Sequence, residues 1–199
     1  MTAPAEETAA EDTAAENTAD WGTLSDLPGN PLMWILILSE LAVFGAFLIG
    51  FTGARIVDPG GFANSQALLS RVDGGINTLV LVTSGWLAAL AGRAIHDRKP
   101  NACRGWLLGA MALGAVFLAV KAVEYSGKAA LGIGLETNTF FTLYYLITGF
   151  HALHVVLGMV ILAIGVWRPR PDTVETGTAF WHMVDLIWVL VYPVIYLVR

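Results

Sequence analysis

The residues of this chain that could do chemistry are the few polar ones inside its long apolar runs. Glu40 has 13 uncharged residues before it and 14 after it, which predicts a position near the middle of an apolar helix. An ionisable group in such a setting is costly and is a functional candidate by default. Two interpretations stay open: a protonated or hydrogen-bonded structural carboxyl that faces another helix, and a proton-linked or lipid-linked site.

Two later apolar runs carry histidines. His151 and His154 are three residues apart and therefore share one helical face with Tyr144 and Thr148. The last run has a stripe about 80° wide at 100° per residue, with His182 on its flank and Trp181, Asp185, Trp188, Tyr192 and Tyr196 as members. We predict that the two helices face each other and that the histidines donate to Asp185 or to backbone acceptors. The predicted buried network consists of His151, His154, His182, Asp185, Tyr144, Thr148 and Tyr192.

The alternative is that these histidines ligate a b-type haem or a metal ion. Three embedded histidines do not forbid one haem, but a copper or zinc site normally has three or four convergent ligands. Gly149 and Gly158 lie close to the histidines and indicate tight helix packing instead. Cys103 is the single cysteine, which excludes a CxxC metal or redox motif. The hydrogen-bond network is therefore the favoured interpretation, with no catalytic, cofactor or metal residue predicted.

Lys121 and Glu124 follow a shorter run of 16 uncharged residues, Gly105–Val120. They are three residues apart, so they can form an ion pair on one face of a helix. The lysine stem is expected to snorkel toward the membrane interface. This pattern predicts that the helix ends close to the pair.

The elements that position these residues are five apolar spans. The chain has 199 residues, of which 56% are hydrophobic and 14% are charged, whereas about 25% is usual for charge in soluble domains. A bilayer core of about 30 Å needs roughly 20 apolar residues per helix. The sequence predicts an all-α, polytopic five-helix bundle in a membrane domain of residues 29–199, with spans over residues 31–53, 74–95, 105–123, 139–167 and 180–198.

The net charge of −5 belongs to the N-terminal segment. Seven acidic residues and no basic residue lie within residues 1–28: Glu6, Glu7, Glu11, Asp12, Glu16, Asp20 and Asp26. Residues 1–28 are predicted to be a disordered acidic tail, and the chain lacks the basic surface of a nucleic-acid-binding protein. Six basic residues in two loops, Arg93, Arg98, Lys99, Arg104, Arg168 and Arg170, predict a cytoplasmic N-terminus and a periplasmic C-terminus in a bacterial cytoplasmic membrane.

Five strings in these spans carry a resemblance to a known family. They are SELAVFGAF (39–47), INTLVLVTSG (76–85), VEY (123–125), TGFHALHVVLG (148–158) and WHMVDLIWVLVY (181–192). In this order the strings resemble subunit III of haem–copper respiratory oxidases. The resemblance implies a subunit without haem or metal that packs on the catalytic haem–copper subunit. It also implies a phospholipid cleft, faced by Glu40, near a proposed oxygen route.

The chain has five predicted spans, whereas the mitochondrial type of subunit III has seven. It is therefore similar to the short forms, and its start, DLPGNPLMWILILSELAVFGAF, most resembles the E protein encoded with bacterial nitric oxide reductase. The resemblance implies a non-catalytic accessory subunit of an oxidoreductase complex, most similar to the nitric oxide reductase type. The alternatives are subunit III proper of a cytochrome c or quinol oxidase, and an independent membrane haem-binding electron carrier or transporter.

Overall fold

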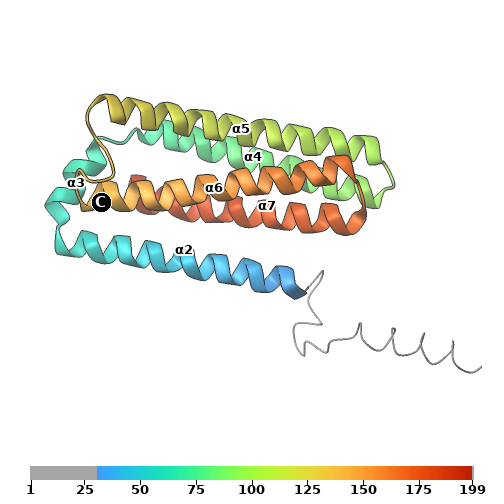
Figure 1. Ribbon diagram of the computed structural model, residues 1–199, viewed down its shortest axis with the longest axis horizontal. Helices are drawn as coiled ribbons and strands as arrows, with labels where there is room; N and C mark the ends of the chain where they lie inside the picture. Colours follow the sequence, from blue (N-terminus) through green and yellow to red (C-terminus); the bar gives the residue numbers. More distant parts are fainter. Residues whose placement is uncertain (1–30, 199) are drawn as a thin grey trace, which may run out of the picture.

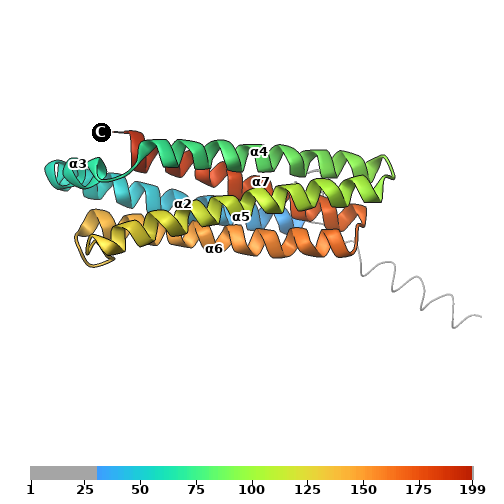
Figure 2. The ribbon, with the colours of Figure 1, turned by 90° about the horizontal axis from the view of Figure 1, so that it is seen from above.

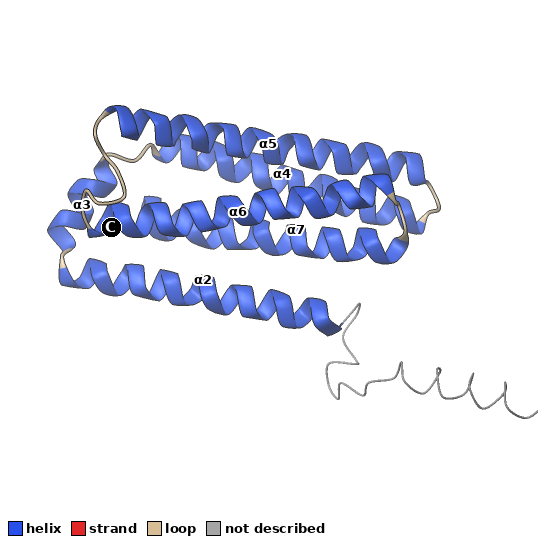
Figure 3. Ribbon diagram, in the orientation of Figure 1, coloured by secondary structure: helices blue, strands red, loops and turns tan. Residues whose placement is uncertain are grey.

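The computed structural model describes residues 31–198, which form helices and short connections without a β-strand in that range (Figure 3). The elements are α2 (Pro31–Val57), α3 (Pro59–Ala67), α4 (Arg71–His96), α5 (Pro100–Ala130), α6 (Thr139–Trp167), α7 (Pro171–Tyr192) and the π-helix η2 (Pro193–Leu197). In this described part of the chain, five helices are long and apolar enough to cross a membrane. The predicted class, an all-α membrane protein with five spans, is confirmed. The predicted acidic tail, residues 1–28, lies outside the described residues.

Four of the long helices form a bundle, and the fifth covers one side of it. Helices α4, α5, α6 and α7 contact one another in a ring, and α2 lies against α6 and α7 (Figures 1 and 2). The first residues of α2 lie at the same end as the α4–α5 and α6–α7 turns, while α3 lies at the opposite end (Figure 1). The two basic loops therefore share one end of the bundle with the start of α2.

Trp181 of α7 is the centre of the bundle's packing. Its side chain is fully buried, and its indole nitrogen donates to Ser84 Oγ on α4 at 3.0 Å. A Cβ atom on Gly158 of α6 or on Gly114 of α5 would lie 2.7 Å from the Trp181 ring. Glycine is required at both positions because the indole occupies the space of a side chain.

Two predicted spans were too short. The third, 105–123, is the 31-residue helix α5, which continues past Lys121 because its charged residues find partners inside the bundle. The fifth, 180–198, begins at Pro171, because proline suits the first turn and Asp172 supplies a negative charge there. The fourth, 139–167, coincides with α6.

Helix α3 and the π-helix η2 are absent from the prediction and depend on each other. Asp58 caps α3 by accepting from the Gly61 N–H at 2.9 Å. Pro193 has no N–H, so the last turn of α7 cannot continue as a regular α-helix. The buried Gln66 amide of α3 donates to the carbonyl oxygens of Ile195 at 2.8 Å and Val198 at 3.0 Å. These bonds satisfy carbonyls that the irregular helix end leaves open.

We expect Gln66→Leu to lower the free energy of unfolding by about 1–3 kcal/mol, because two carbonyls lose their donor. Unfolding in mixed micelles measures the change. Asn64→Leu is the matched control, since Asn64 is exposed on the same helix. Equal stability of the two variants would contradict a role for Gln66 in holding η2.

Candidate functional site

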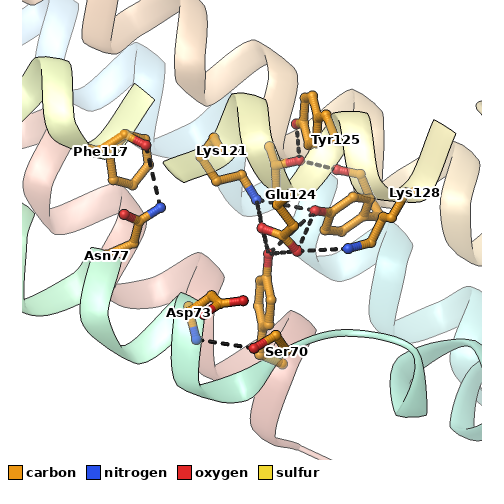
Figure 4. A network of polar contacts seen from close by, with 12 residues as sticks. Ser70, Asp73, Asn77, Phe117, Lys121, Glu124, Tyr125 and Lys128 are labelled. Carbon is orange, nitrogen blue, oxygen red and sulfur yellow. Dashed lines mark hydrogen bonds and ion pairs between the residues drawn. The ribbon is translucent and has the colours of Figure 1, made fainter. Parts of the chain in front are cut away.

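A buried ion cluster lies on one face of α5 (Figure 4). Glu124 accepts from Lys121 Nζ at 2.8 Å with Oε2 and from Lys128 Nζ at 2.9 Å with Oε1. The three residues are spaced by three and four positions, which places their side chains together on the helix. Their side chains are 3%, 6% and 7% exposed for Lys121, Glu124 and Lys128. We call these three residues the ion cluster.

Tyrosines from two other elements complete the ion cluster. Tyr144 of α6 donates to Glu124 Oε1 at 2.8 Å, and Tyr196 of η2 donates to the same carboxylate at 3.1 Å. Lys121 Nζ donates to Tyr144 Oη at 3.1 Å and to Tyr196 Oη at 2.9 Å. With Glu124 as third acceptor, every N–H of Lys121 has a partner. The cluster therefore joins α5, α6 and η2.

The position of Lys121 differs from the sequence-based expectation. The predicted pair with Glu124 is present, but the lysine points into the bundle instead of snorkelling to the interface. Its ammonium lies 5.1–5.6 Å from the ring centres of Tyr125, Tyr144, Trp188 and Tyr196. Aromatic faces attract a desolvated cation, which makes the interior position favourable. Sequence reasoning missed Lys128, although its spacing of four from Glu124 is a signal for the same pair.

Thr148 extends the cluster along α6. Its hydroxyl bonds the Tyr125 hydroxyl at 2.5 Å and donates to the Tyr144 carbonyl at 2.6 Å. Of the predicted network, Tyr144 therefore bonds Lys121 and Glu124, while Thr148 bonds Tyr125 and the Tyr144 carbonyl.

Glu40 pairs with His154 between α2 and α6. Glu40 Oε2 lies 3.1 Å from His154 Nε2, and the side chains are 20% and 11% exposed. The other ring nitrogen, Nδ1, lies 2.9 Å from the carbonyl oxygen of Phe150. Nitrogen that bonds a carbonyl must carry hydrogen. Within residues 31–198, Glu40 Oε2 has no hydrogen-bond partner, so its contact with Nε2 is a close approach of the two polar groups and not an aligned hydrogen bond.

We expect Glu40→Gln to keep the fold and change the free energy of unfolding by less than about 1 kcal/mol, because the amide has the size of the carboxyl and still places a polar group beside His154. Glu40→Leu should cost about 1–3 kcal/mol, because it leaves Nε2 without a partner in the bundle. Unfolding in mixed micelles compares the two variants. Destabilisation by glutamine as large as by leucine would show that the carboxyl itself is structural.

The remaining members of the predicted network, apart from His154, do not bond one another. His151 is fully buried, and neither ring nitrogen has a hydrogen-bond partner among the described residues; it packs 5.1 Å from the Trp188 ring and 5.6 Å from the Phe117 ring. His182 Nδ1 lies 3.9 Å from Asp185 Oδ2, beyond hydrogen-bond distance. Tyr192 donates to the Arg71 carbonyl at 3.2 Å. The predicted single network is wrong, because its members lie in separate places, but α6 and α7 do pack together and His154 does meet a backbone carbonyl, as predicted.

Asp185 is buried against α4 with one oxygen, Oδ1, that has no hydrogen-bond partner within residues 31–198. A side chain on Gly85 would collide with the Asp185 carboxyl. Over the same residues, no three His, Cys, Asp or Glu side chains converge in a way that could hold a metal ion.

The part of the chain that matches a known family contains all of the sites described above. A family model described as cytochrome c oxidase subunit III matches residues 32–198, which hold the five spans, the ion cluster and the Glu40–His154 pair. The chain belongs to the cytochrome c oxidase subunit III family. The predicted resemblance to this family is thereby confirmed.

Individual members of the family differ in length. Cytochrome c oxidase subunit 3 of Thermostichus vulcanus is 36% identical over 131 residues, which cover 61% of this chain and 64% of that protein. Heme-copper oxidase subunit I+III of Aeropyrum pernix is 33% identical over 180 residues, covering 83% of this chain and 22% of that protein. Cytochrome bo(3) ubiquinol oxidase subunit 3 of Pseudomonas putida is 25% identical over 175 residues, covering 82% and 83%. The match thus covers less than two thirds of the length of the Thermostichus vulcanus and Aeropyrum pernix proteins.

Proposed function

We propose that this chain is a non-catalytic accessory membrane subunit of a respiratory complex of the haem–copper oxidase superfamily. The observation that carries the proposal is the subunit III match over all five spans. The partner proposed is the catalytic subunit I, and the Aeropyrum pernix relative, whose name joins subunits I and III, supports that partnership. The subunit would stabilise its partner in the membrane.

The partner enzyme is proposed to be an aerobic oxidase. The relatives are named for cytochrome c and ubiquinol oxidases, and the match covers 83% of the ubiquinol oxidase subunit, so a short chain suits this class. A nitric oxide reductase-associated subunit is the second candidate. It is supported by the resemblance of the segment before and into α2, DLPGNPLMWILILSELAVFGAF, to the E protein of that system.

Glu40 is the residue we propose to act at a lipid or gas path. It is the acidic side chain of helix α2, which is covered by the bundle on one side, and 20% of its side chain is exposed beside His154. The apolar side chains around it on α2, Leu36 and Val43, are 43% and 42% exposed. A polar group surrounded by such a surface suits a bound phospholipid and the passage of a small apolar gas.

Purification of the tagged full-length chain from its native membrane tests the proposal. We expect a haem–copper catalytic subunit to co-purify, and mass spectrometry of that subunit chooses between an oxidase and a nitric oxide reductase. Absence of any such subunit from gently solubilised membranes would overturn the proposal. A reduced b-type haem band in the isolated chain would instead support an electron carrier.

The proposed orientation has a cytoplasmic N-terminus and a periplasmic C-terminus. It rests on the six Lys and Arg residues of the α4–α5 and α6–α7 regions, which share one end with the start of α2. A reporter that is active only in the periplasm should work when fused after Arg199. Activity of a cytoplasm-dependent reporter at that site would reverse the orientation.

A further inference from the structure

A groove of about 540 Å3 lies between the start of α4 and the end of α5, away from the Glu40–His154 pair. Lys128 and Glu124 of the ion cluster lie along it, and Asp73 and Ser70 line it from the α4 side. The rest of its lining is apolar, with Val120, Val123 and Leu131 among the residues. The groove therefore combines opposite charges with a surface suited to hydrocarbon.

The ion cluster contains two lysines and one glutamate, so it carries an excess positive charge. Lys121 uses all three N–H donors on Glu124, Tyr144 and Tyr196. Within residues 31–198, Lys128 donates only to Glu124, and its ammonium otherwise faces the Tyr144 ring at 5.4 Å. The excess charge and two unused donors therefore belong to Lys128, whose side chain is 7% exposed.

Asp73 supplies the opposite charge on the α4 side of the groove. Its backbone N–H donates to Ser70 Oγ at 3.2 Å, while its exposed carboxylate pairs with no cation among residues 31–198. Figure 4 shows Asp73 on α4 beside the ion cluster. A ligand in this groove meets a donor with positive charge on one side and a carboxylate on the other.

The apolar part of the groove has the length of one membrane leaflet. Lys128 lies two residues before the end of α5, where a membrane-spanning helix reaches the head-group region. From Lys128 back to Ala119, the deepest α5 residue of the groove, the helix rises about 13 Å. Half of the hydrocarbon core is about 15 Å. A Cβ atom on Gly127 would meet no atom within 4 Å, so the groove is open there.

We propose that this groove binds a phospholipid whose head group carries both a phosphate and a primary ammonium. The phosphate accepts from Lys128, the ammonium donates to Asp73, and an acyl chain lies along Val120 and Val123. A quaternary ammonium head group has no N–H to donate to Asp73. An anionic head group that ends in a neutral alcohol, as in phosphatidylglycerol, brings no positive charge to Asp73. The site is separate from Glu40 and does not depend on the proposed function.

Native mass spectrometry of the full-length chain tests the proposal. The purified protein is exchanged into detergent with phosphatidylethanolamine, phosphatidylcholine or phosphatidylglycerol of identical acyl chains. We expect one phosphatidylethanolamine to be retained about tenfold more strongly than either of the others, as the loss of one charge-assisted hydrogen bond implies. Equal retention of the three lipids overturns the proposal.

Three variants separate the groove from the general lipid surface. Lys128→Met should abolish the preference, whereas Lys99→Met, at an exposed lysine of the other end, should keep it. Asp73→Asn should reduce the preference over phosphatidylcholine about tenfold with unchanged thermal stability, because Asp73 is exposed. Gly127→Leu should block the groove without changing a charge. Wild-type retention in Asp73→Asn and Gly127→Leu overturns the proposal even where Lys128→Met fails to fold.

Discussion

Glu124→Gln should lower the free energy of unfolding by about 3–5 kcal/mol, the cost of leaving buried charges without their partner. Glu124 bonds both buried lysines, Lys121 and Lys128. The amide keeps the size of the side chain, so the change isolates the lost negative charge. Unfolding in mixed micelles measures the effect, and recovery of the complex by co-purification should fall with it.

The matched control for this variant is Glu136→Gln, because Glu136 is exposed between α5 and α6. The control should unfold like the wild type. Adding Lys128→Met to Glu124→Gln should restore part of the loss, since one uncompensated buried charge is then removed. A Glu124→Gln protein as stable as the control would mean that the cluster does not hold α5, α6 and η2 together.

Trp181→Ala should cost about 3–5 kcal/mol, the range for truncating a buried aromatic side chain. The indole fills the space over Gly114 and Gly158 and bonds Ser84, so alanine leaves a cavity between α4, α5 and α6. The same unfolding measurement applies. Trp86→Ala is the control, because Trp86 is 62% exposed on α4.

The two tryptophan variants should differ by most of this cost, because Trp86 loses little packing. Equal losses in the free energy of unfolding would indicate that contact with detergent or lipid stabilises a tryptophan here as much as packing between helices does. Within the proposed complex, the Trp181→Ala chain should also co-purify with less catalytic subunit, since a loosened bundle changes the surface presented to its partner.

Local signals account for the parts of the fold that the sequence predicts well. Helix α6 begins and ends at the predicted residues, because Asn138 caps its start by accepting from Phe141 and Arg168–Pro169 follows its end. Hydropathy identifies all five spans because each span must be one continuous apolar helix, in which the backbone N–H and C=O groups bond one another within the membrane. The family motifs are equally local, and they led to the family that the comparison confirmed.

The buried polar residues are less predictable, as Tyr192 and Tyr196 show. Both lie on the predicted stripe of the last span, but Tyr192 donates to the Arg71 carbonyl, whereas Tyr196 reaches Glu124 from the π-helix η2. The two histidines of α6 also share a face and have different partners. His154 meets Glu40 of α2, and His151, one turn earlier, packs among aromatic rings.

By itself, the sequence determined the five apolar spans, the face of each helix that carries polar residues, and the family. Only the tertiary structure decided which partner each polar residue meets, that α5 continues beyond Lys121, and that α3 satisfies the end of η2. The physical reason is that periodicity defines a direction around the helix axis, whereas a partner also requires the same height on a neighbouring helix. That height depends on the packing of all the helices. The ion cluster and its tyrosines meet because α5, α6 and η2 place their polar side chains at the same height.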